Sequence, residues 1–298
     1  MEKTLAIVGA GRVGRALGRR LHELGWKIGI VVTPSEASSR RAVRFIGAGK
    51  PHAGLTRHVL FSNLILIATP DDVIPAVAHE LARMGGEELH GRIVLHTSGA
   101  QDSSALSPLR EFGAAIGSLH PLQTFSGVGV PDLAGKVFAV EGDVVAVRVA
   151  RQIARALGGS PVQIGAGKKA LYHAAAVLAA GHVLALVEAA TQLLISLGIK
   201  RSEATRALLP LTRQVLDNFQ RVGPRAAWTG PLARGDYRIV ESHLRALQDS
   251  REEIAIAYEA VNRLAACLLA QDTAGTIAEL EKISVALKPK VKARGGHG

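Results

Sequence analysis

The chain has 298 residues, of which 48% are hydrophobic and 20% are charged, and its formal net charge is +11. This length allows two domains with cores of their own, and the composition excludes a disordered chain. The single cysteine, Cys267, excludes an intramolecular disulfide and favours a reducing compartment. Because Cys267 stands in an apolar helical pattern, we expect a small buried side chain rather than a catalytic one.

The sequence also restricts compartment and partners. No signal-peptide pattern precedes the first apolar run, so we expect a cytoplasmic protein. The most membrane-like stretch, Ala174–Val187, is interrupted by Gly181 and His182 and is shorter than the roughly 20 apolar residues of a span, so we expect a buried helix and no membrane partner. Basic residues are dispersed and only 4% of residues are aromatic, so the charge suits small anionic ligands and predicts no nucleic-acid partner.

The first predicted strand, Leu5–Val8, leads directly into a G-x-G-x-x-G spacing and then an amphipathic helix. In this arrangement Gly9 permits a tight turn, Gly11 lets a pyrophosphate approach the backbone, and Gly14 lets the helix pack closely on the strand. The free N–H groups of the helix start then face the phosphates. The predicted dinucleotide-binding loop consists of Gly9, Gly11, Arg12, Val13 and Gly14.

The end of the second predicted strand, Ile28–Val32, governs the choice of cofactor. The positions after it supply hydroxyls and positive charge that suit a 2′-phosphate: Thr33, Ser35, Ser38, Arg40 and Arg41. They favour NADP. Glu36 is the competing acid that would bind the ribose of NAD, and the two arginines could instead belong to a solvated helix face.

Polar residues follow the next two predicted strands, Leu64–Ala68 and Ile93–His96. Because the carboxyl ends of parallel strands share one edge of a sheet, these segments can line the cofactor crevice. Helix capping explains the first segment equally well. The expected cofactor contacts here are Ala68, Thr69, Pro70, Thr97 and Ser98.

Further strands are expected at Ala115–Leu119, Val137–Val140 and Pro161–Ile164. The alternation of strands with helical patterns predicts an α/β domain over residues 1–164, a doubly wound, mostly parallel sheet of the Rossmann type. His120 directly precedes a proline and is therefore held out of helical geometry, which suits a catalytic or substrate-contacting side chain that projects into a cleft. A structural histidine is an equally good reading of His120.

From Gly165 onward the pattern becomes helical and rich in Ala and Leu, which predicts an all-α domain over residues 165–288. We expect this domain to complete the substrate cleft and to carry a homodimer interface. Residues 289–298 form a basic, Gly-rich tail that we expect to be disordered. The expected helices are 168–197, 203–222, 237–247, 251–270 and 273–287.

The strongest catalytic candidates are Lys169, Tyr172 and His173, whose spacing places them on one helix face. Reduction of a carbonyl or imine needs a hydride at carbon and a proton at the heteroatom, and these side chains could supply the proton. A position in the first helical turn would lower the pKa of Lys169. The alternative is two exposed lysines, Lys168 and Lys169, beside a partly buried Tyr-His pair.

Later in the chain, Arg234 and Asp236 lie in a predicted turn, Thr229–Asp236. Arg234 could bind a substrate carboxylate through both guanidinium N–H groups, and Asp236 could orient it or cap the next helix. We expect no metal site, since the 11 histidines are dispersed and no paired-cysteine or H-E-x-x-H spacing occurs. No G-x-S-x-G elbow for nucleophilic hydrolysis is present.

Taken together, the motifs resemble a family: the Rossmann-like oxidoreductases related to pyrroline-5-carboxylate reductase, often labelled deazaflavin-dependent NADP oxidoreductases. The resemblance covers nearly the whole chain and rests on Gly9–Gly14, Ala68–Asp72, His96–Gly99, Leu119–Phe125, Tyr172–Val177 and Thr229–Asp236. It implies an NAD(P)-binding fold, a helical domain that dimerises, and reductase or dehydrogenase activity. A more distant resemblance, to 6-phosphogluconate and β-hydroxyacid dehydrogenases, rests on Lys169; where they have an asparagine four residues later, this chain has His173.

The sequence therefore favours an NADP-dependent oxidoreductase acting on a small, anionic carbonyl, imine or hydroxy acid. Two alternatives remain at this stage. One is a regulatory or redox-sensing protein that binds NADP(H) without turnover. The other is hydride transfer between a deazaflavin and NADP, which would need a second large cleft.

Overall fold

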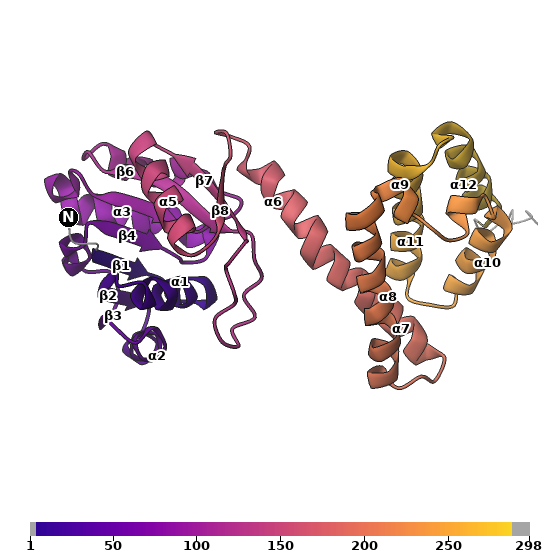
Figure 1. Ribbon diagram of the computed structural model, residues 1–298, viewed down its shortest axis with the longest axis horizontal. Coiled ribbons are helices and arrows are strands. Elements are labelled where there is room, and N and C mark those ends of the chain that lie inside the picture. Colours follow the sequence, from indigo (N-terminus) through magenta and orange to yellow (C-terminus); the bar gives the residue numbers. More distant parts are fainter. Residues whose placement is uncertain (1–3, 288–298) are drawn as a thin grey trace, which may run out of the picture. The chain divides into compact units, whose positions relative to one another are not determined.

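A computed structural model describes residues 4–287 of the chain (Figure 1). The predicted tail, residues 289–298, lies outside the described residues. The chain divides into two compact units between Ala179 and Ala180, later than the boundary expected after residue 164. The difference arises because helix α6 (Lys169–Val177) begins with a residue, Lys169, that is buried and bonded to Ser98 of the first unit.

The first unit is built on one eight-stranded sheet with the order β3-β2-β1-β4-β5-β6-β7-β8. All neighbouring strands are parallel except β6 and β7, which are antiparallel. The strands are β1 (Thr4–Val8), β2 (Lys27–Thr33), β3 (Lys50–Ala53), β4 (Leu64–Ile67), β5 (Ile93–His96), β6 (Ala115–Pro121), β7 (Val137–Gly142) and β8 (Ser160–Gln163). The predicted Rossmann-type sheet is thus confirmed.

The sequence analysis missed one strand, β3, at the edge of the sheet. Its four residues are polar or small, include Pro51 and lack any apolar run. Proline is tolerated in an edge strand because its missing N–H costs no ladder hydrogen bond there. An edge strand of this kind leaves no hydrophobic pattern to detect.

Helices cover both faces of the sheet, and buried apolar residues form one core cluster on each face. Leu17, Leu21 and Phe138 belong to one cluster, and Ile74 and Leu81 to the other. The helices of this unit are α1 (Arg12–Glu23), α2 (Glu36–Ile46), α3 (Ile74–Gly85), α4 (Ser107–Arg110), α5 (Val144–Ala156) and α6, with short 3-10 turns at Arg57–Phe61, Asp71–Val73, Gly86–Leu89 and Ser103–Leu106.

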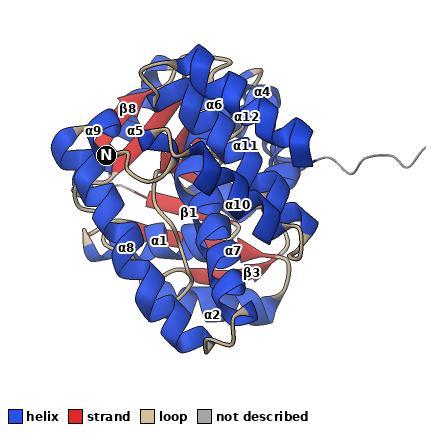
Figure 2. Cartoon of the chain, turned by 90° about the vertical axis from the view of Figure 1, so that its right-hand side faces the viewer, coloured by secondary structure: helices blue, strands red, loops and turns tan. Residues whose placement is uncertain are grey.

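The second unit contains helices only, and in Figure 2 the strands, drawn in red, all belong to the first unit. Its helices are α7 (Val183–Ser196), α8 (Arg201–Val222), α9 (Pro224–Ala227), α10 (Tyr237–Leu247), α11 (Glu252–Leu269) and α12 (Thr273–Leu287), with a 3-10 turn at Leu232–Arg234. The predicted all-α domain is confirmed. Its core cluster includes Val240, Leu244 and Leu280.

Two expectations about burial are wrong. Most of the stretch Ala174–Val187 is exposed rather than buried, and Leu184 alone is 70% exposed. Cys267 is also exposed, because α11 turns Ala266 rather than Cys267 into the core. Helical periodicity identifies which residues share a face but does not say whether another element of the same chain covers that face.

One helix of the described residues, Lys169–Ser196, is long and apolar enough to span a membrane by length and composition. Its mean hydropathy reaches 1.8 over a window of which none is buried. Its first residue, Lys169, nevertheless lies inside the α/β unit, where its ammonium group is bonded to a strand-end loop.

Candidate functional site

The glycine loop after β1 divides into two positions that the fold requires and one that it does not. Gly9 has a φ of +85°, and a Cβ there would lie 2.6 Å from the Thr69 backbone nitrogen. A side chain at Gly14 would collide with the Gly9 carbonyl. A Cβ at Gly11, in contrast, would meet nothing within 4 Å. Packing does not explain Gly11, and an open backbone at this turn is what a pyrophosphate needs.

The loops after β4 and β5 are tied together beside this turn. The Ser98 hydroxyl donates to Asp71 Oδ2 over 2.7 Å and accepts from the N–H groups of Ala100 and Gln101. Ser98 was predicted to contact the cofactor. In the structure its hydroxyl is fully used in bonds that hold the two loops together. Thr69 Oγ1, in contrast, is buried without a hydrogen-bond partner among the described residues.

The remaining predicted cofactor contacts lie on the same edge of the sheet, in the order that the strands impose. Ala68 packs under the glycine loop, since a side chain at Gly14 would approach its Cβ to 2.9 Å. Thr97 follows β5, and its N–H bonds the Ile67 carbonyl of β4 over 3.0 Å. Pro70 lies between these segments and precedes the 3-10 turn at Asp71.

The segment after β2 forms a compact hydroxyl cluster at the start of α2. Ser35 caps the helix by accepting from the Ser38 N–H, and the Thr33 and Ser38 hydroxyls lie 2.5 Å apart. The Arg40 guanidinium pairs with Glu36 at 2.5 Å, and both side chains are 64% exposed. Glu36, the acid that would bind the ribose of NAD, is therefore paired with Arg40. The pair is exposed, so it contributes little to stability.

Next to this crevice, three of the four predicted catalytic side chains meet around Gly99. His120 Nδ1 and the Tyr172 hydroxyl are 3.0 Å apart. The rings of His120 and His173 are arranged edge to face with centroids 5.8 Å apart. A Cβ at Gly99 would lie 2.8 Å from His120 Nε2 and would collide with His173 Nδ1. Only a residue without a side chain leaves room for both imidazoles.

The fourth candidate, Lys169, is buried beside this group, with its ammonium nitrogen 5.8 Å from the centre of the Tyr172 ring. Its side chain is 1% exposed and its ammonium donates to the Ser98 carbonyl over 2.8 Å. Burial lowers the pKa of Lys169 to about 8, while Glu141, Asp71 and Asp102 favour its charged form. Lys169 therefore acts on its neighbours through its charge and through the Ser98 backbone.

Burial and the Lys169 charge also set the protonation of the aromatic groups. Desolvation, with a smaller contribution from Lys169, lowers the pKa of His120 to about 4. Desolvation raises the pKa of Tyr172 to about 12. At neutral pH the pair thus consists of a neutral imidazole and a neutral phenol, which hold one shared and one spare hydrogen between them.

A buried histidine, His96, fixes the loop after β5. Burial lowers the pKa of His96 to about 4, so the ring is neutral. Since Nδ1 accepts from the Ser98 N–H over 3.2 Å, the proton lies on Nε2, which donates to the Asp102 carbonyl over 3.1 Å. The histidine thereby positions the same Ser98 whose carbonyl holds Lys169.

Sequence analysis missed one buried acid of this region. Glu141, at the end of β7, is 6% exposed and accepts from the Ser103 N–H over 2.6 Å and from the Ser103 hydroxyl over 2.8 Å. It contributes to the field at Lys169. Its only signal in the sequence is an acid that ends an apolar strand run, a position that antiparallel β7 turns toward the interior.

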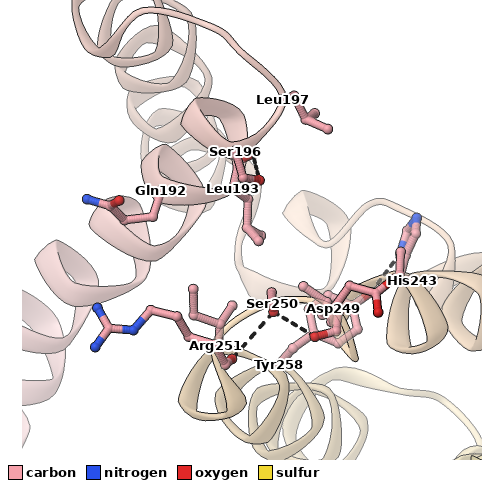
Figure 3. Close-up of a pocket in the computed structure, with 12 residues that line it drawn as sticks. Gln192, Leu193, Ser196, Leu197, His243, Asp249, Ser250, Arg251 and Tyr258 are labelled. Atoms are coloured by element: carbon pink, nitrogen blue, oxygen red, sulfur yellow. Dashed lines mark hydrogen bonds between the residues drawn. The ribbon is translucent and has the colours of Figure 1, made fainter.

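Arg234 and Asp236 belong to the helical unit, where their side chains pair at 3.0 Å on an exposed turn. Asp236 precedes α10 without donating or accepting a side-chain capping bond, so the capping alternative is wrong in this structure. The helical unit also has a cavity of about 870 Å³ between α7, α10 and α11 (Figure 3). Its His243 and Tyr258 bond each other over 2.8 Å, and none of the predicted site residues lines it.

Within residues 4–287, no group of three or more histidine, cysteine or acidic side chains is arranged to hold a metal ion. The acids of the site are instead bonded to hydroxyls and backbone N–H groups, as for Asp71 and Glu141. The described part of the site therefore offers hydrogen bonds and a buried ammonium rather than a ligand cage.

Two domain families match the chain. A Rossmann-like domain family matches residues 2–121, and a domain of unknown function, DUF2520, matches residues 136–265. No curated protein matches the chain.

Solved structures resemble the chain over most of its length. A candidate NADP oxidoreductase from Bacteroides fragilis is 21% identical, with a TM-score of 0.75 over 88% of this chain and 97% of that one. An imine reductase from Pseudomonas sp. is 19% identical, with a TM-score of 0.65 over 95% of this chain and 100% of that one. A reductive aminase from Aspergillus terreus, in complex with NADPH and ethyl-5-oxohexanoate, is 19% identical, with a TM-score of 0.60 over 100% of this chain and 97% of that one. At these identities the likeness establishes the shared fold.

Proposed function

We propose that this protein is an NADP(H)-dependent oxidoreductase that reduces the C=O or C=N bond of a small anionic molecule, or oxidises the corresponding hydroxy acid. One observation carries the proposal: a proton-bearing Tyr172–His120 pair lies at the same sheet edge as the glycine loop, and the Asp71–Ser98 bond links the intervening loops. A polar pair beside a nucleotide loop is what reduction of a polar double bond requires.

The chain fits a dinucleotide at three points. Gly11 leaves its backbone open, the α1 N-terminus carries no acid in its first turn, and the buried Thr69 hydroxyl lacks a partner in the described residues. The N–H groups at the start of α1 would bind the pyrophosphate. When bound, the nicotinamide supplies or accepts the hydride.

The protein's own contribution is the proton. If Tyr172 donates to His120 Nδ1, the imidazole keeps an N–H at Nε2; if Nδ1 donates to the phenol oxygen, the phenol keeps its O–H. Either arrangement leaves one hydrogen for the substrate heteroatom. A phenol with a pKa near 12 remains protonated at neutral pH and is regenerated from water after each transfer.

Lys169 serves as a positioning residue in this scheme. Its buried charge adds to the effect of burial, which is the main reason for the low pKa of His120, and its bond to the Ser98 carbonyl fixes the loop that carries Gly99. Because a positive charge under the site also attracts anions, Lys169 favours a substrate that bears a carboxylate.

For the cofactor we propose NADP in preference to NAD. The hydroxyl cluster of Thr33, Ser35 and Ser38 supplies donors, and Arg40 can leave its exposed pair with Glu36 to meet a 2′-phosphate. The NADPH complex of the reductive aminase, which has the same fold, supports this choice.

We further propose a homodimer in a reducing, cytoplasmic setting. The apolar helix Lys169–Ser196 and the helix α8 expose large side chains, including Leu184, Leu211 and Phe219 at 70%, 63% and 56%. Exposed apolar surface of this extent is typical of a subunit interface. A single exposed cysteine is compatible with a reducing compartment.

The proposal is tested first by the melting temperature of the purified protein with NADP, NADPH, NAD and NADH, for the wild type and Gly11→Val. A ligand that binds only the native state raises the free energy of unfolding by roughly 3 kcal/mol at 100 times its Kd, and the melting temperature rises with it. We expect a larger shift with NADP(H) than with NAD(H), and its loss in Gly11→Val.

Because a Cβ at Gly11 would meet nothing within 4 Å, we expect the variant without nucleotide to melt at the same temperature as the wild type. An equal shift in the variant would contradict the proposed loop. Tight NADP(H) binding without turnover of any oxo, imino or hydroxy acid would instead identify a non-catalytic NADP(H)-binding protein.

A further inference from the structure

A second polar cavity, of about 420 Å³, lies between α5 and the end of β8. The antiparallel step in the sheet sets its place: Gly142, which ends β7 and lines the cavity, pairs with Gly117 near the start of β6. The cavity follows α5 and the edge strand β8, whose Gln163 pairs with Val140 of β7. The glycine loop follows β1, and four strands separate β1 from β8 in the sheet.

Three arginines of one helix face line this cavity. Arg148, Arg151 and Arg155 are spaced three and four residues apart along α5, so their side chains project from the same side of the helix. No carboxylate pairs with any of them among the described residues. Elsewhere on the surface arginines do find acids, as Arg110 finds Asp143 at 2.7 Å and Arg201 finds Glu188 at 2.7 Å.

The acid nearest in sequence, Asp143, cannot neutralise them. Its carboxylate is shared between Arg110 and the N–H of Ile116, which it accepts over 3.0 Å. Within residues 4–287, the only side-chain partner of the three arginines is an uncharged amide: Gln163 Oε1 accepts from Arg151 over 2.8 Å. That bond holds the guanidinium across the cavity and leaves its charge uncompensated.

We propose that this cavity is a binding site for a small polyanion with at least two phosphate or carboxylate groups. A guanidinium group binds a phosphate and a carboxylate with the same bidentate geometry. Three adjacent guanidinium groups carry three positive charges, so more than one anionic group is needed to neutralise them. The volume falls within the range of small-molecule sites. Val147 and the exposed Val144 provide an apolar wall for the body of such a ligand.

The test is isothermal titration of the full-length protein with sodium tripolyphosphate and, separately, with citrate, each with and without saturating NADP. The two probes distinguish phosphate from carboxylate ligands. We expect one probe to bind at one site per chain, with NADP leaving its affinity unchanged. In Arg148→Gln/Arg155→Gln its affinity should fall at least about tenfold, since two charge-assisted contacts are lost.

The matched control is Arg206→Gln/Arg213→Gln, which removes two exposed, unpaired arginines of α8 and the same net charge. It should bind the probe like the wild type. Equal weakening in both double variants, displacement of the probe by NADP, or no binding of either probe would each overturn the proposal. NADP binding by Arg148→Gln/Arg155→Gln should remain at the wild-type level, which separates this site from the proposed nucleotide loop.

Discussion

The two compact units of this chain handle burial in opposite ways. The α/β unit buries charged and polar groups, including Lys169 at 1% and Glu141 at 6% exposure, and bonds each to hydroxyls or backbone groups. The helical unit buries few polar groups and exposes large apolar ones, such as Leu184 and Phe219. An unpaired buried charge costs several kcal/mol, so a fold keeps a paired one where it serves chemistry or specificity.

The contrast assigns different tasks to the two units. The first holds a neutral, hydrogen-bearing aromatic pair under the influence of a buried ammonium. The second has a small core whose described members include Val240 and Leu280. Its exposed apolar side chains would be buried by contact with another subunit. We therefore propose that the α/β unit carries the chemistry and that the helical unit carries the subunit interface, and each of the following predictions tests one half of this comparison.

The largest effect is expected from charging the apolar helices. Leu184→Glu/Phe219→Glu would bury two carboxylates in the proposed dimer interface, at a cost of roughly 5 kcal/mol or more. We expect a dimer in the wild type and a monomer in the variant by sedimentation equilibrium. Phe61→Glu, which charges a 73% exposed residue of the α/β unit, should stay dimeric. A monomeric wild type would refute this half of the comparison.

Lys169→Met should lower kcat by about a thousandfold, or roughly 4 kcal/mol, because it removes the charge and the bond that position the site. The dissociation constant of NADPH should change little. Since the Lys169 charge lowers the pKa of His120, the variant should also shift the acidic limb of the pH profile of kcat to higher pH.

The control is Lys168→Met. Lys168 is exposed and is the N-cap residue, directly before the first residue of α6. Its kcat and pH profile should match the wild type. Wild-type turnover in Lys169→Met would remove the buried ammonium from the account.

A smaller effect is expected in the pH dependence of stability. His96 and His120 have pKa values of about 4 in the fold, below the 6.5 of an exposed histidine, so the unfolded chain binds more protons between these values. The free energy of unfolding therefore rises with pH from about 4 to 6.5, and His96 contributes on the order of 3 kcal/mol.

Urea denaturation at several pH values measures this slope. His96→Gln should reduce the slope, while His79→Gln, which changes an exposed histidine, should preserve it. A wild-type slope in His96→Gln would contradict the assignment of a buried neutral imidazole.

Much of the fold could be predicted because its signals are local. Apolar runs such as Leu64–Ile67 and the turn at Gly9 identify strands and their connection without reference to distant residues. The edge strand β3 has no such run, and the exposure of Leu184 depends on what surrounds the helix. Neither can be found from a pattern within one element.

Part of the geometry around Gly99 could be predicted from the sequence in the same way. Helical spacing places Tyr172 and His173 on the face of Lys169, three and four residues after it, and a strand end places His120 at the crevice. That Lys169 turns inward to Ser98 while Glu141 supports it from another strand is a tertiary fact. Residues that meet only after folding leave no common spacing in the sequence.

The most direct test of the central claim is oxidation of NADPH by the wild type and Tyr172→Phe, with a panel of cyclic imines and oxo acids. The account predicts turnover of at least one substrate by the wild type and a loss of at least about a hundredfold in the variant. NADPH should still raise the melting temperature of both proteins. Equal turnover by Tyr172→Phe would contradict the proposed proton donor, and NADPH binding without any turnover by the wild type would contradict the assignment as an enzyme.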